Sequence, residues 1–476
     1  MLVGREQEQT ILSKLLKSTQ AEFVAIYGRR RIGKTYLVRQ FFREQLVFSF
    51  TGAFEAETTI QINNFWVELK RVYPQAKDFE APHNWSEAFQ YLTDYVISLR
   101  ESTQKIVIFI DELPWLDRTG ANFVSALEYF WNQHGSQQDK LIFITRGSAA
   151  SWMIGKLLKA QGGLHNRVTC RIELKPFTLR ETKAYCSFRN LKFNDYQIAQ
   201  LYMILGGIPY YWQAIEQGKS VAQVIESLCF DNNGLLTKEF EYLYYSLFKN
   251  AEKHIKVIEA LAAHPYGLTR TQLLAETNIS NGGNFVRVIE NLTDCGFIKA
   301  LEPFGKKNRD TVFRIIDFYS VFYLKYIINN VGNRNNTWQN LSTSASYHSW
   351  MGYAFENICL THLNPIHVAL GIGGVYTKVS SFYFKGNDEL PGAQVDMVIE
   401  RNDGIIHLCE AKFTNTEFVL TKEVNQALRR KRLVFQAVTK TKKMVVSTLF
   451  STYPAIQNQY YNEEIHSEVS LESLFN

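Results

Sequence analysis

Residues 28–35 read Gly-Arg-Arg-Arg-Ile-Gly-Lys-Thr and follow the apolar run at residues 23–27. This is the G-x-x-x-x-G-K-[ST] pattern of a phosphate-binding loop, placed after a predicted strand and before a predicted helix over residues 35–42. Gly28 and Gly33 carry no Cβ, so backbone N–H groups can turn inward around a polyphosphate. The positive end of the following helix would face the same anion. The pattern therefore predicts an α/β fold that binds a nucleotide at the end of a strand.

Two residues of this loop have a predicted chemical role beyond shaping it. Lys34 would contact the β- and γ-phosphates, and Thr35 would ligate Mg²⁺. ATP and Mg²⁺ are the expected cofactors. The predicted nucleotide contacts are Gly28, Arg29, Arg30, Arg31, Ile32, Gly33, Lys34, Thr35 and Tyr36.

A second apolar run at residues 106–110 is followed by Asp111 and Glu112. Five apolar residues in succession, most of them β-branched, predict a strand buried on both faces of a parallel sheet. The carboxyl ends of such strands are where doubly wound folds place their ligands. Asp111 would hold the Mg²⁺ shell and Glu112 would polarise the attacking water, so hydrolysis is predicted as well as binding. The alternative is a strand capped by two solvated acids.

Composition limits the class of protein. The chain has 476 residues, of which 46% are hydrophobic and 21% charged, which predicts a globular protein of roughly two to four domains. No apolar run is long enough to span a membrane, and the N-terminus does not read as a signal peptide. The six scattered cysteines favour reduced thiols in the cytoplasm over disulfides or a zinc site. A net charge of +6 permits contact with nucleic acid without arguing for it.

Polar residues after the next predicted strand, at residues 140–145, could reach the γ-phosphate. Thr145 and Ser148 are the candidates, and Arg146 is either a phosphate sensor or an exposed cation. Arg167 could supply charge to a nucleotide, in cis or across a subunit interface, or be a solvated loop cation. The Gly206-Gly207-Ile208-Pro209 segment predicts either a turn between helices or a contact with adenine.

The order of these motifs resembles the archaeal-type ATPases, P-loop proteins near the AAA+ and STAND groups. The resemblance covers about the first 230 residues. It implies an arginine-finger position for Arg167, an adenine-side position for Pro209 and a possible homo-oligomer formed through the ATPase domain. Arg146 departs from the small or Cys residue expected before Gly-Ser. The motifs that carry the resemblance are Gly4-Arg5-Glu6, the phosphate loop, Phe109-Ile110-Asp111-Glu112, Gly147-Ser148, Arg167 and Gly206-Gly207-x-Pro209.

The middle of the chain, at residues 252–298, reads as three helices, the second beginning at Thr269 and the third covering residues 285–292. A polar hairpin follows, with Lys306, Lys307 and Arg309, before an apolar strand at residues 311–315. This order predicts a winged helix-turn-helix with the three wing cations near DNA phosphates. The alternative is a lid that only packs against the ATPase and whose wing is solvated.

The C-terminal part carries a pattern of acids and a lysine on predicted strands. Asp396 stands near the start of one strand, and the next, at residues 405–412, carries Glu410 and Lys412. Positions i and i+2 of a strand share a side, so this acid and amine point toward whatever Asp396 addresses. Two carboxylates for Mg²⁺, with a lysine that positions or deprotonates a water, are what phosphodiester hydrolysis needs. An upstream helix at residues 352–358 carries Glu356.

This arrangement resembles the PD-(D/E)XK restriction-endonuclease-like superfamily, as found in a domain commonly fused to archaeal-type ATPases. The resemblance implies that Asp396 and Glu410 are metal ligands and that Gln426 is an auxiliary residue. The proline that usually precedes the first acid is missing. A domain with surface acids and a salt-bridged lysine, and a nuclease fold that does not cleave, are the alternatives. The implied catalytic set is Glu356, Asp396, Glu410 and Lys412.

A run of cations at residues 429–432, Arg-Arg-Lys-Arg, lies on a predicted helix that begins near Lys422. Four consecutive residues wrap a helix and cannot share one face, so some are solvated while others could follow a phosphate backbone.

The predicted organisation is a P-loop ATPase core at 1–178, a helical lid at 179–248, a winged helix at 249–328, a linker at 329–346 and a nuclease-like domain at 347–476. The function expected from it is ATP hydrolysis coupled to a DNA-directed, Mg²⁺-dependent nuclease-like domain that nucleotide state gates. One alternative is a signalling or scaffold ATPase that binds DNA or protein with an inactive nuclease-like fold. Another is a transcription regulator that senses ATP and binds DNA through residues 285–292.

Overall fold

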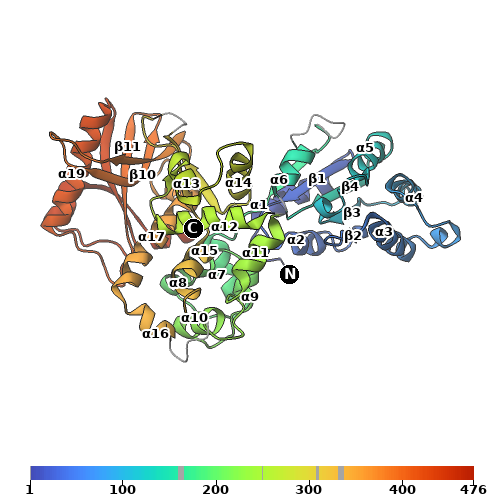
Figure 1. The fold of residues 1–476 in the computed structure, drawn as a ribbon, viewed down its shortest axis with the longest axis horizontal. Helices are drawn as coiled ribbons and strands as arrows, with labels where there is room; N and C mark the ends of the chain where they lie inside the picture. The colour runs from blue at the N-terminus through green and yellow to red at the C-terminus, as the bar shows by residue number, and fades with distance from the viewer. Residues whose placement is uncertain (1, 149, 159–165, 249, 307–309, 331–336) are drawn as a thin grey trace. The chain divides into compact units, whose positions relative to one another are not determined.

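The computed structural model describes residues 2–148, 150–158, 166–248, 250–306, 310–330 and 337–476. It divides into two compact units, Met1–Pro176 and Phe177–Asn476 (Figure 1). No helix within these described ranges combines the length and the apolar composition that crossing a membrane requires.

The first unit is built on a parallel five-stranded sheet of order β2-β3-β4-β1-β5. Every residue of β3 and β4 is buried, because apolar side chains on both faces are covered. This confirms the strands predicted at residues 23–27, 106–110 and 140–145. The strands are β1 (Glu22–Tyr27), β2 (Leu46–Thr51), β3 (Ile106–Asp111), β4 (Leu141–Arg146) and β5 (Cys170–Glu173).

Helices α3, α4 and α5 cover one face of this sheet with an aromatic core. The Phe23 ring, for example, contacts Trp131 and Phe143 at centroid distances of 4.9 and 5.3 Å. In the sheet order, β4 lies between β1 and β3, so the loops that follow these three strands meet at one edge of the sheet. The helices of this unit include α1 (Glu6–Leu16), α2 (Lys34–Phe41), α3 (Thr58–Val72), α4 (Trp85–Ser98), α5 (Phe123–Gln133) and α6 (Ala150–Trp152).

The second unit begins with helices and continues into a small antiparallel sheet of order β6-β8-β7. The second helix was predicted to begin at Thr269; α13 begins at Arg270, and the Thr269 hydroxyl caps it by accepting the N–H of Gln272. The helices of its first part are α7 (Leu179–Phe188), α8 (Asp195–Leu205), α9 (Pro209–Gln213), α10 (Val221–Cys229) and α11 (Glu239–Leu247). The elements that follow are α12 (Ala251–Ala263), β6 (Leu268–Thr269), α13 (Arg270–Thr277), α14 (Gly283–Asp294), β7 (Ile298–Leu301) and β8 (Val312–Ile315).

The end of the chain forms a mixed sheet of order β13-β12-β11-β10-β9, with α19 packed against β10 and β12 (Figure 1). Strands β9 to β11 are antiparallel, and β12 and β13 continue the sheet parallel to β11. The helices are α15 (Phe318–Phe322), α16 (Thr337–Ser342), α17 (Ala345–Thr361), α18 (Leu363–Ala369), α19 (Lys422–Thr439) and α20 (Gln459–Glu464). The strands are β9 (Thr377–Phe384), β10 (Ala393–Arg401), β11 (Ile405–Lys412), β12 (Met444–Ser451) and β13 (Ile465–Ser470).

The segment predicted as a linker, residues 329–346, is corrected in its second half. Residues 331–336 lie outside the described part of the chain, but α16 follows directly and buries Trp338 against Phe230 and Phe322. The backbone N–H groups of Thr337 and Trp338 donate to the Glu226 carboxylate at 3.3 and 2.8 Å. A buried indole and two N–H groups bound by a carboxylate pack this half of the predicted linker against the rest of the unit.

Candidate functional sites

The loop between β1 and α2 has the backbone shape that a phosphate cradle needs. Gly28 has a φ of 129°, and a Cβ at this position would lie 2.2 Å from the carbonyl oxygen of Leu174. Gly33, with a φ of 88°, stands directly before α2, whose first residue is Lys34. Both positions require glycine, since L-residues rarely adopt these angles and the first also lacks room for a side chain.

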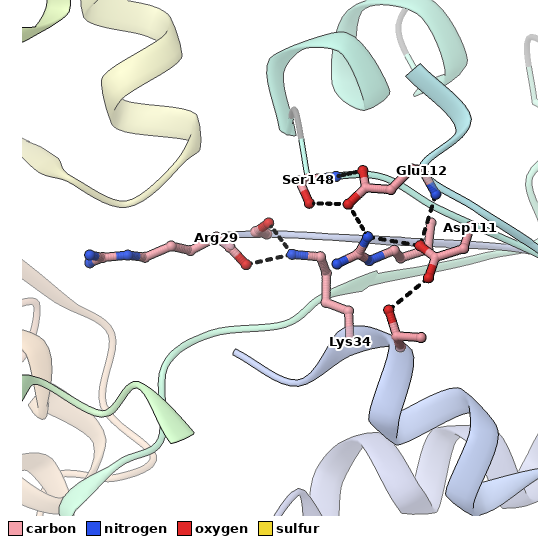
Figure 2. A network of polar contacts seen from close by, with 8 residues as sticks. Arg29, Lys34, Asp111, Glu112 and Ser148 are labelled. Carbon is pink, nitrogen blue, oxygen red and sulfur yellow. Dashed lines mark hydrogen bonds and ion pairs between the residues drawn. The ribbon is translucent and has the colours of Figure 1, made fainter. Parts of the chain in front are cut away.

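Lys34 is buried within this loop. Its ammonium donates to the carbonyl oxygen of Gly28 at 2.7 Å and to that of Arg29, while the Arg29 side chain runs away from it (Figure 2). The backbone therefore holds the positive charge in place at the loop, ready for phosphate oxygens that would compete with these carbonyls.

Arg5 supports the loop from a distance in sequence, and it was absent from the predicted site residues. Its guanidinium donates to the carbonyl oxygen of Lys175 at 2.6 Å and to that of Ile32 at 3.0 Å. One buried side chain thus joins the phosphate loop to the segment after β5, using the fork of donors that arginine provides. In the sequence, the Gly4-Arg5-Glu6 motif contributes to the family resemblance, and it is the one pattern that could have indicated a role for Arg5.

Asp111 is the last residue of β3 and Glu112 follows it, and Thr35 contacts Asp111. The Thr35 hydroxyl donates to Asp111 Oδ2 at 2.7 Å, so the two predicted magnesium ligands of this unit lie together. Glu112 has a left-handed backbone with a φ of 50°, uncommon for a residue with a side chain. Its carboxylate accepts hydrogen bonds from the Ser148 hydroxyl at 2.6 Å and the Ser148 N–H at 3.1 Å (Figure 2). Such backbone strain is concentrated at functional sites.

Arg146 joins the two acids, which corrects the alternative of an exposed cation. Its guanidinium donates to Asp111 Oδ1 at 2.8 Å and to Glu112 Oε1, and its side chain is only 10% exposed. Thr145 points elsewhere, because successive residues of a strand alternate in direction; its hydroxyl donates to the Val24 carbonyl at 3.3 Å within the sheet. Of the candidates after β4, Arg146 and Ser148 therefore reach the acids, and Thr145 does not.

The remaining predicted nucleotide contacts are spread over both units. Arg167 is exposed in the turn before β5, and Tyr36 is 52% exposed on α2. Pro209 begins α9 in the second unit, just after Gly207. The Gly207 carbonyl accepts the Phe177 N–H at 2.7 Å, and a Cβ on Gly207 would lie 1.8 Å from the Phe177 carbonyl oxygen. This close backbone approach favours the reading of the glycines as a packed turn between helices.

In the second unit, Glu410 and Lys412 lie on the same side of β11, as predicted. The Lys412 ammonium donates to Glu410 Oε1 at 2.8 Å, and Lys431 of α19 donates to Glu410 Oε2 at 2.8 Å. Burial raises the pKa of Glu410, but the two ammonium groups outweigh it and hold that pKa below its usual range. This carboxylate is therefore charged and already binds two cations.

Asp396 lies on the strand next to these residues. Met397 pairs with Cys409 across β10 and β11, so the register places the Asp396 backbone beside that of Glu410. A bulge between Val395 and Val398 occurs at the same point, and bulges near sites change the direction of side chains. Among the side chains that the structure describes, which exclude that of Asp396, no three His, Cys, Asp or Glu residues gather into a metal site.

Glu356 lies on the opposite face of this sheet, which corrects the predicted catalytic set. It lies on α17 and forms an ion pair with Arg314 of β8, in which Arg314 Nη2 and Glu356 Oε2 are 2.9 Å apart. It also lines, with Cys409, a cavity of about 10 Å³, roughly the space that one water needs. Cys409 and Glu410 are consecutive in β11 and point to opposite faces. The structure therefore brings Glu410 and Lys412 together without Glu356.

The other predicted cations and polar residues occupy varied surroundings. Arg432 pairs with Glu464 at 2.9 Å, while Arg429, Arg430 and Gln426 are exposed on α19. The run of four cations thus divides among several directions, as its helical spacing predicted. In the predicted wing, Lys306 is exposed, and Lys307 and Arg309 lie outside the described residues.

Comparison with known proteins identifies the first part of the chain. Residues 2–215 match the model of a family described as an ATPase domain predominantly from Archaea. The chain belongs to the archaeal-type P-loop ATPases. This ATPase is also 34% identical over 47 residues to an ATP-binding protein of Methanocaldococcus jannaschii, covering 80% of that protein and 10% of this chain.

Two longer matches extend beyond the phosphate loop. An uncharacterised protein of M. jannaschii is 24% identical over 446 residues, which cover 90% of this ATPase and 92% of that protein. The Walker-type ATPase of Pyrococcus abyssi superposes with a TM-score of 0.50 at 17% identity, over 68% of this chain and 96% of that one. The first match extends over most of both chains, and the second shows a shared fold.

We expect Arg146→Ala to lower the free energy of unfolding of this ATPase by about 3 kcal/mol in nucleotide-free buffer. The change would leave the Asp111 and Glu112 carboxylates buried side by side without the cation they share. Chemical denaturation measures the loss. Arg100→Ala, which removes an exposed partner of Glu101, is the matched control and should change little. Equal losses in the two variants would contradict a stabilising role for Arg146.

Proposed function

We propose that this ATPase requires Mg²⁺, and that its C-terminal domain hydrolyses phosphodiester bonds of DNA under the control of nucleotide state. The observation that carries the first part is the contact of Thr35 with Asp111 beside the buried ammonium of Lys34. Two oxygen donors side by side suit a hard divalent cation. A bound Mg²⁺ would neutralise charge that develops on the phosphate oxygens.

The protein side chains then divide the work of ATP hydrolysis. Lys34 binds the β- and γ-phosphates, and Glu112 orients the attacking water and accepts its proton. In the nucleotide-free arrangement, Arg146 and Ser148 hold the Glu112 carboxylate. Release of these contacts would free Glu112 for water and turn Arg146 toward the γ-phosphate. The same residues thus keep the base inactive until a nucleotide is bound.

The contact between Glu410 and Lys412 carries the second part of the proposal. The Glu410 carboxylate offers oxygen ligands to a divalent cation, and Asp396 stands beside it on the neighbouring strand. Lys412 would hold the attacking water and neutralise charge on the scissile phosphate. In this proposal the C-terminal sheet with α19 is a nuclease-like fold.

A DNA-binding role is proposed for the segment α12 to β8, interpreted as a winged helix. Its third helix, α14, buries Phe285 and Leu292 in the core of the unit, so neither side chain is available to bases. Arg287 on the exposed face of α14, and Lys306 after β7, are two exposed cations that could contact DNA phosphates.

A stack of aromatic rings provides a physical route by which the helices could control Glu410 and Lys412. Tyr196 of α8 stacks on Phe413 with centroids 5.0 Å apart and an interplanar angle of 8°, and on Tyr453 at 6.1 Å. Phe413 directly follows Lys412 in the chain. A shift of α8 would therefore move the residue next to the proposed catalytic lysine, which supports gating through the helical part of this unit.

The test is incubation of supercoiled and linear DNA with the full-length protein, Mg²⁺ and ATP, followed by gel analysis. We expect cleavage by the wild type and a loss of at least about 100-fold in Lys412→Ala, because the water and the phosphate lose their positive partner. Lys422→Ala, which removes an exposed lysine of α19, is the control and should cleave normally. The absence of cleavage in every nucleotide state, on DNA and on RNA, would overturn this part of the proposal.

A second candidate is a signalling or scaffold ATPase with an inactive nuclease-like fold. It is favoured by the occupation of both Glu410 oxygens by ammonium groups and by the distance of Glu356 from that cluster across the sheet. Nucleotide-dependent oligomers, measured by light scattering and unchanged in Asp396→Ala, would support this candidate if no cleavage is found.

A further inference from the structure

Glu410 is the centre of an unusual group of charges. Each of its carboxylate oxygens accepts one ammonium at 2.8 Å, from Lys412 on its own strand and from Lys431 on α19. The carboxylate is 16% exposed, whereas the two lysine side chains are 33% and 26% exposed. One mostly buried negative charge thus faces two positive charges that are more exposed to solvent. Both ammonium groups would repel a divalent cation that approaches Glu410, so departure of one of them would favour metal binding.

The two lysines differ in how easily their side chains can move away from the Glu410 carboxylate. Lys412 is two residues from Glu410 on the same face of β11, so strand geometry keeps the two side chains adjacent. Lys431 reaches Glu410 from a helix, and the backbone there is fixed by its neighbour Arg432, which binds Glu464 through two contacts of 2.9 and 3.0 Å. The long, flexible stem of Lys431 can therefore swing while α19 stays in place.

We infer that Lys431 is a displaceable cation that occupies the metal-binding side of Glu410 until a phosphate backbone arrives. This inference rests on the proposed function of the cluster. When a nucleic acid phosphate lies nearby, the ammonium of Lys431 exchanges Glu410 for a phosphate oxygen, and the vacated carboxylate oxygen becomes available to a divalent cation. Metal binding and nucleic acid binding are then coupled, and each strengthens the other.

The same exchange explains why both oxygens of Glu410 are paired in a cluster proposed to bind metal. If Lys431 leaves Glu410 in only about one molecule in ten, the apparent affinity for metal without nucleic acid falls about tenfold. Removal of the Lys431 charge should restore that affinity, although it would weaken binding to the phosphate backbone. A residue with a merely structural role would not tighten metal binding when removed.

The test is titration of Mn²⁺ into full-length protein by calorimetry, in a Lys34→Ala background that silences the ATP site. We expect Lys431→Met, which keeps the hydrocarbon stem, to bind Mn²⁺ about tenfold more tightly than the parent. Lys431→Arg should bind more weakly, because a guanidinium can hold both carboxylate oxygens. Lys422→Ala, an exposed lysine on the same helix, should equal the parent, and Glu410→Gln should lose this binding event.

A second measurement adds a short DNA duplex to the same titrations. The duplex should tighten Mn²⁺ binding by the parent more than by Lys431→Met, in which no exchange remains to be driven. Glu410-dependent Mn²⁺ binding of equal affinity in the parent, Lys431→Met and Lys431→Arg would overturn the role of Lys431 and leave the proposed metal site standing. Absence of Glu410-dependent binding in all of these proteins, each verified as folded by its thermal unfolding, would overturn both.

Discussion

Lys34→Ala is expected to lower the rate of ATP turnover by about 100- to 1,000-fold. The Lys34 ammonium is held inside the loop by the carbonyl oxygens of Gly28 and Arg29, and it is the buried positive charge at the start of α2. Its loss leaves the γ-phosphate without this partner both in the bound state and during transfer. Phosphate release measures turnover, and calorimetry with ATP should show weaker binding as well.

The control for this variant is Arg39→Ala, which removes an exposed cation of the same helix. It should retain turnover close to that of the wild type, since a solvated charge about one turn further along the helix contributes little at the loop. Near-normal turnover in Lys34→Ala would mean that the polyphosphate does not lie in this loop, and the assignment of the whole site would fail.

Glu112→Gln is expected to lower turnover by about 100-fold or more while ATP binding remains close to that of the wild type. Glutamine has the same shape and can keep the hydrogen bond from the Ser148 hydroxyl, but it cannot accept a proton from water. Arg146 keeps Asp111 as its partner in this variant. Single-turnover hydrolysis and ATP titration separate the two effects.

An exposed acid in the same unit provides the comparison for this second variant. Glu44 is exposed just beyond the end of α2. The Glu44→Gln variant should therefore hydrolyse ATP at the wild-type rate. If Glu112→Gln lost ATP binding together with turnover, Glu112 would act chiefly by positioning Arg146. If it kept full turnover, the base would be another residue.

Much of the first unit could be predicted from local patterns. The continuous apolar run before Asp111 predicted a strand buried on both faces, and β3 has that form. The glycines at positions 28 and 33 predicted a tight loop, which their positive φ angles confirm. These features depend on neighbouring residues along the chain, so the sequence expresses them directly.

The network around the acids could not be predicted in the same way. The sequence allows two roles for Arg146, because its partners, Asp111 and Glu112, come from the end of another strand. Arg5 was missed because the carbonyl oxygens it binds belong to Ile32 and Lys175, far apart in sequence. Such contacts depend on strand order, and the order β3-β4-β1 emerges only from packing of the whole sheet.

The cluster of Glu410, Lys412 and Lys431 was also predicted only in part from the sequence. The sequence alone determined that Glu410 and Lys412 share a side, since the period of a strand is two residues. Only the tertiary structure decided that Lys431 completes this cluster and that Glu356 lies on the opposite face, paired with Arg314. Periodicity assigns a face within one element, whereas packing between elements selects the side chains that meet there.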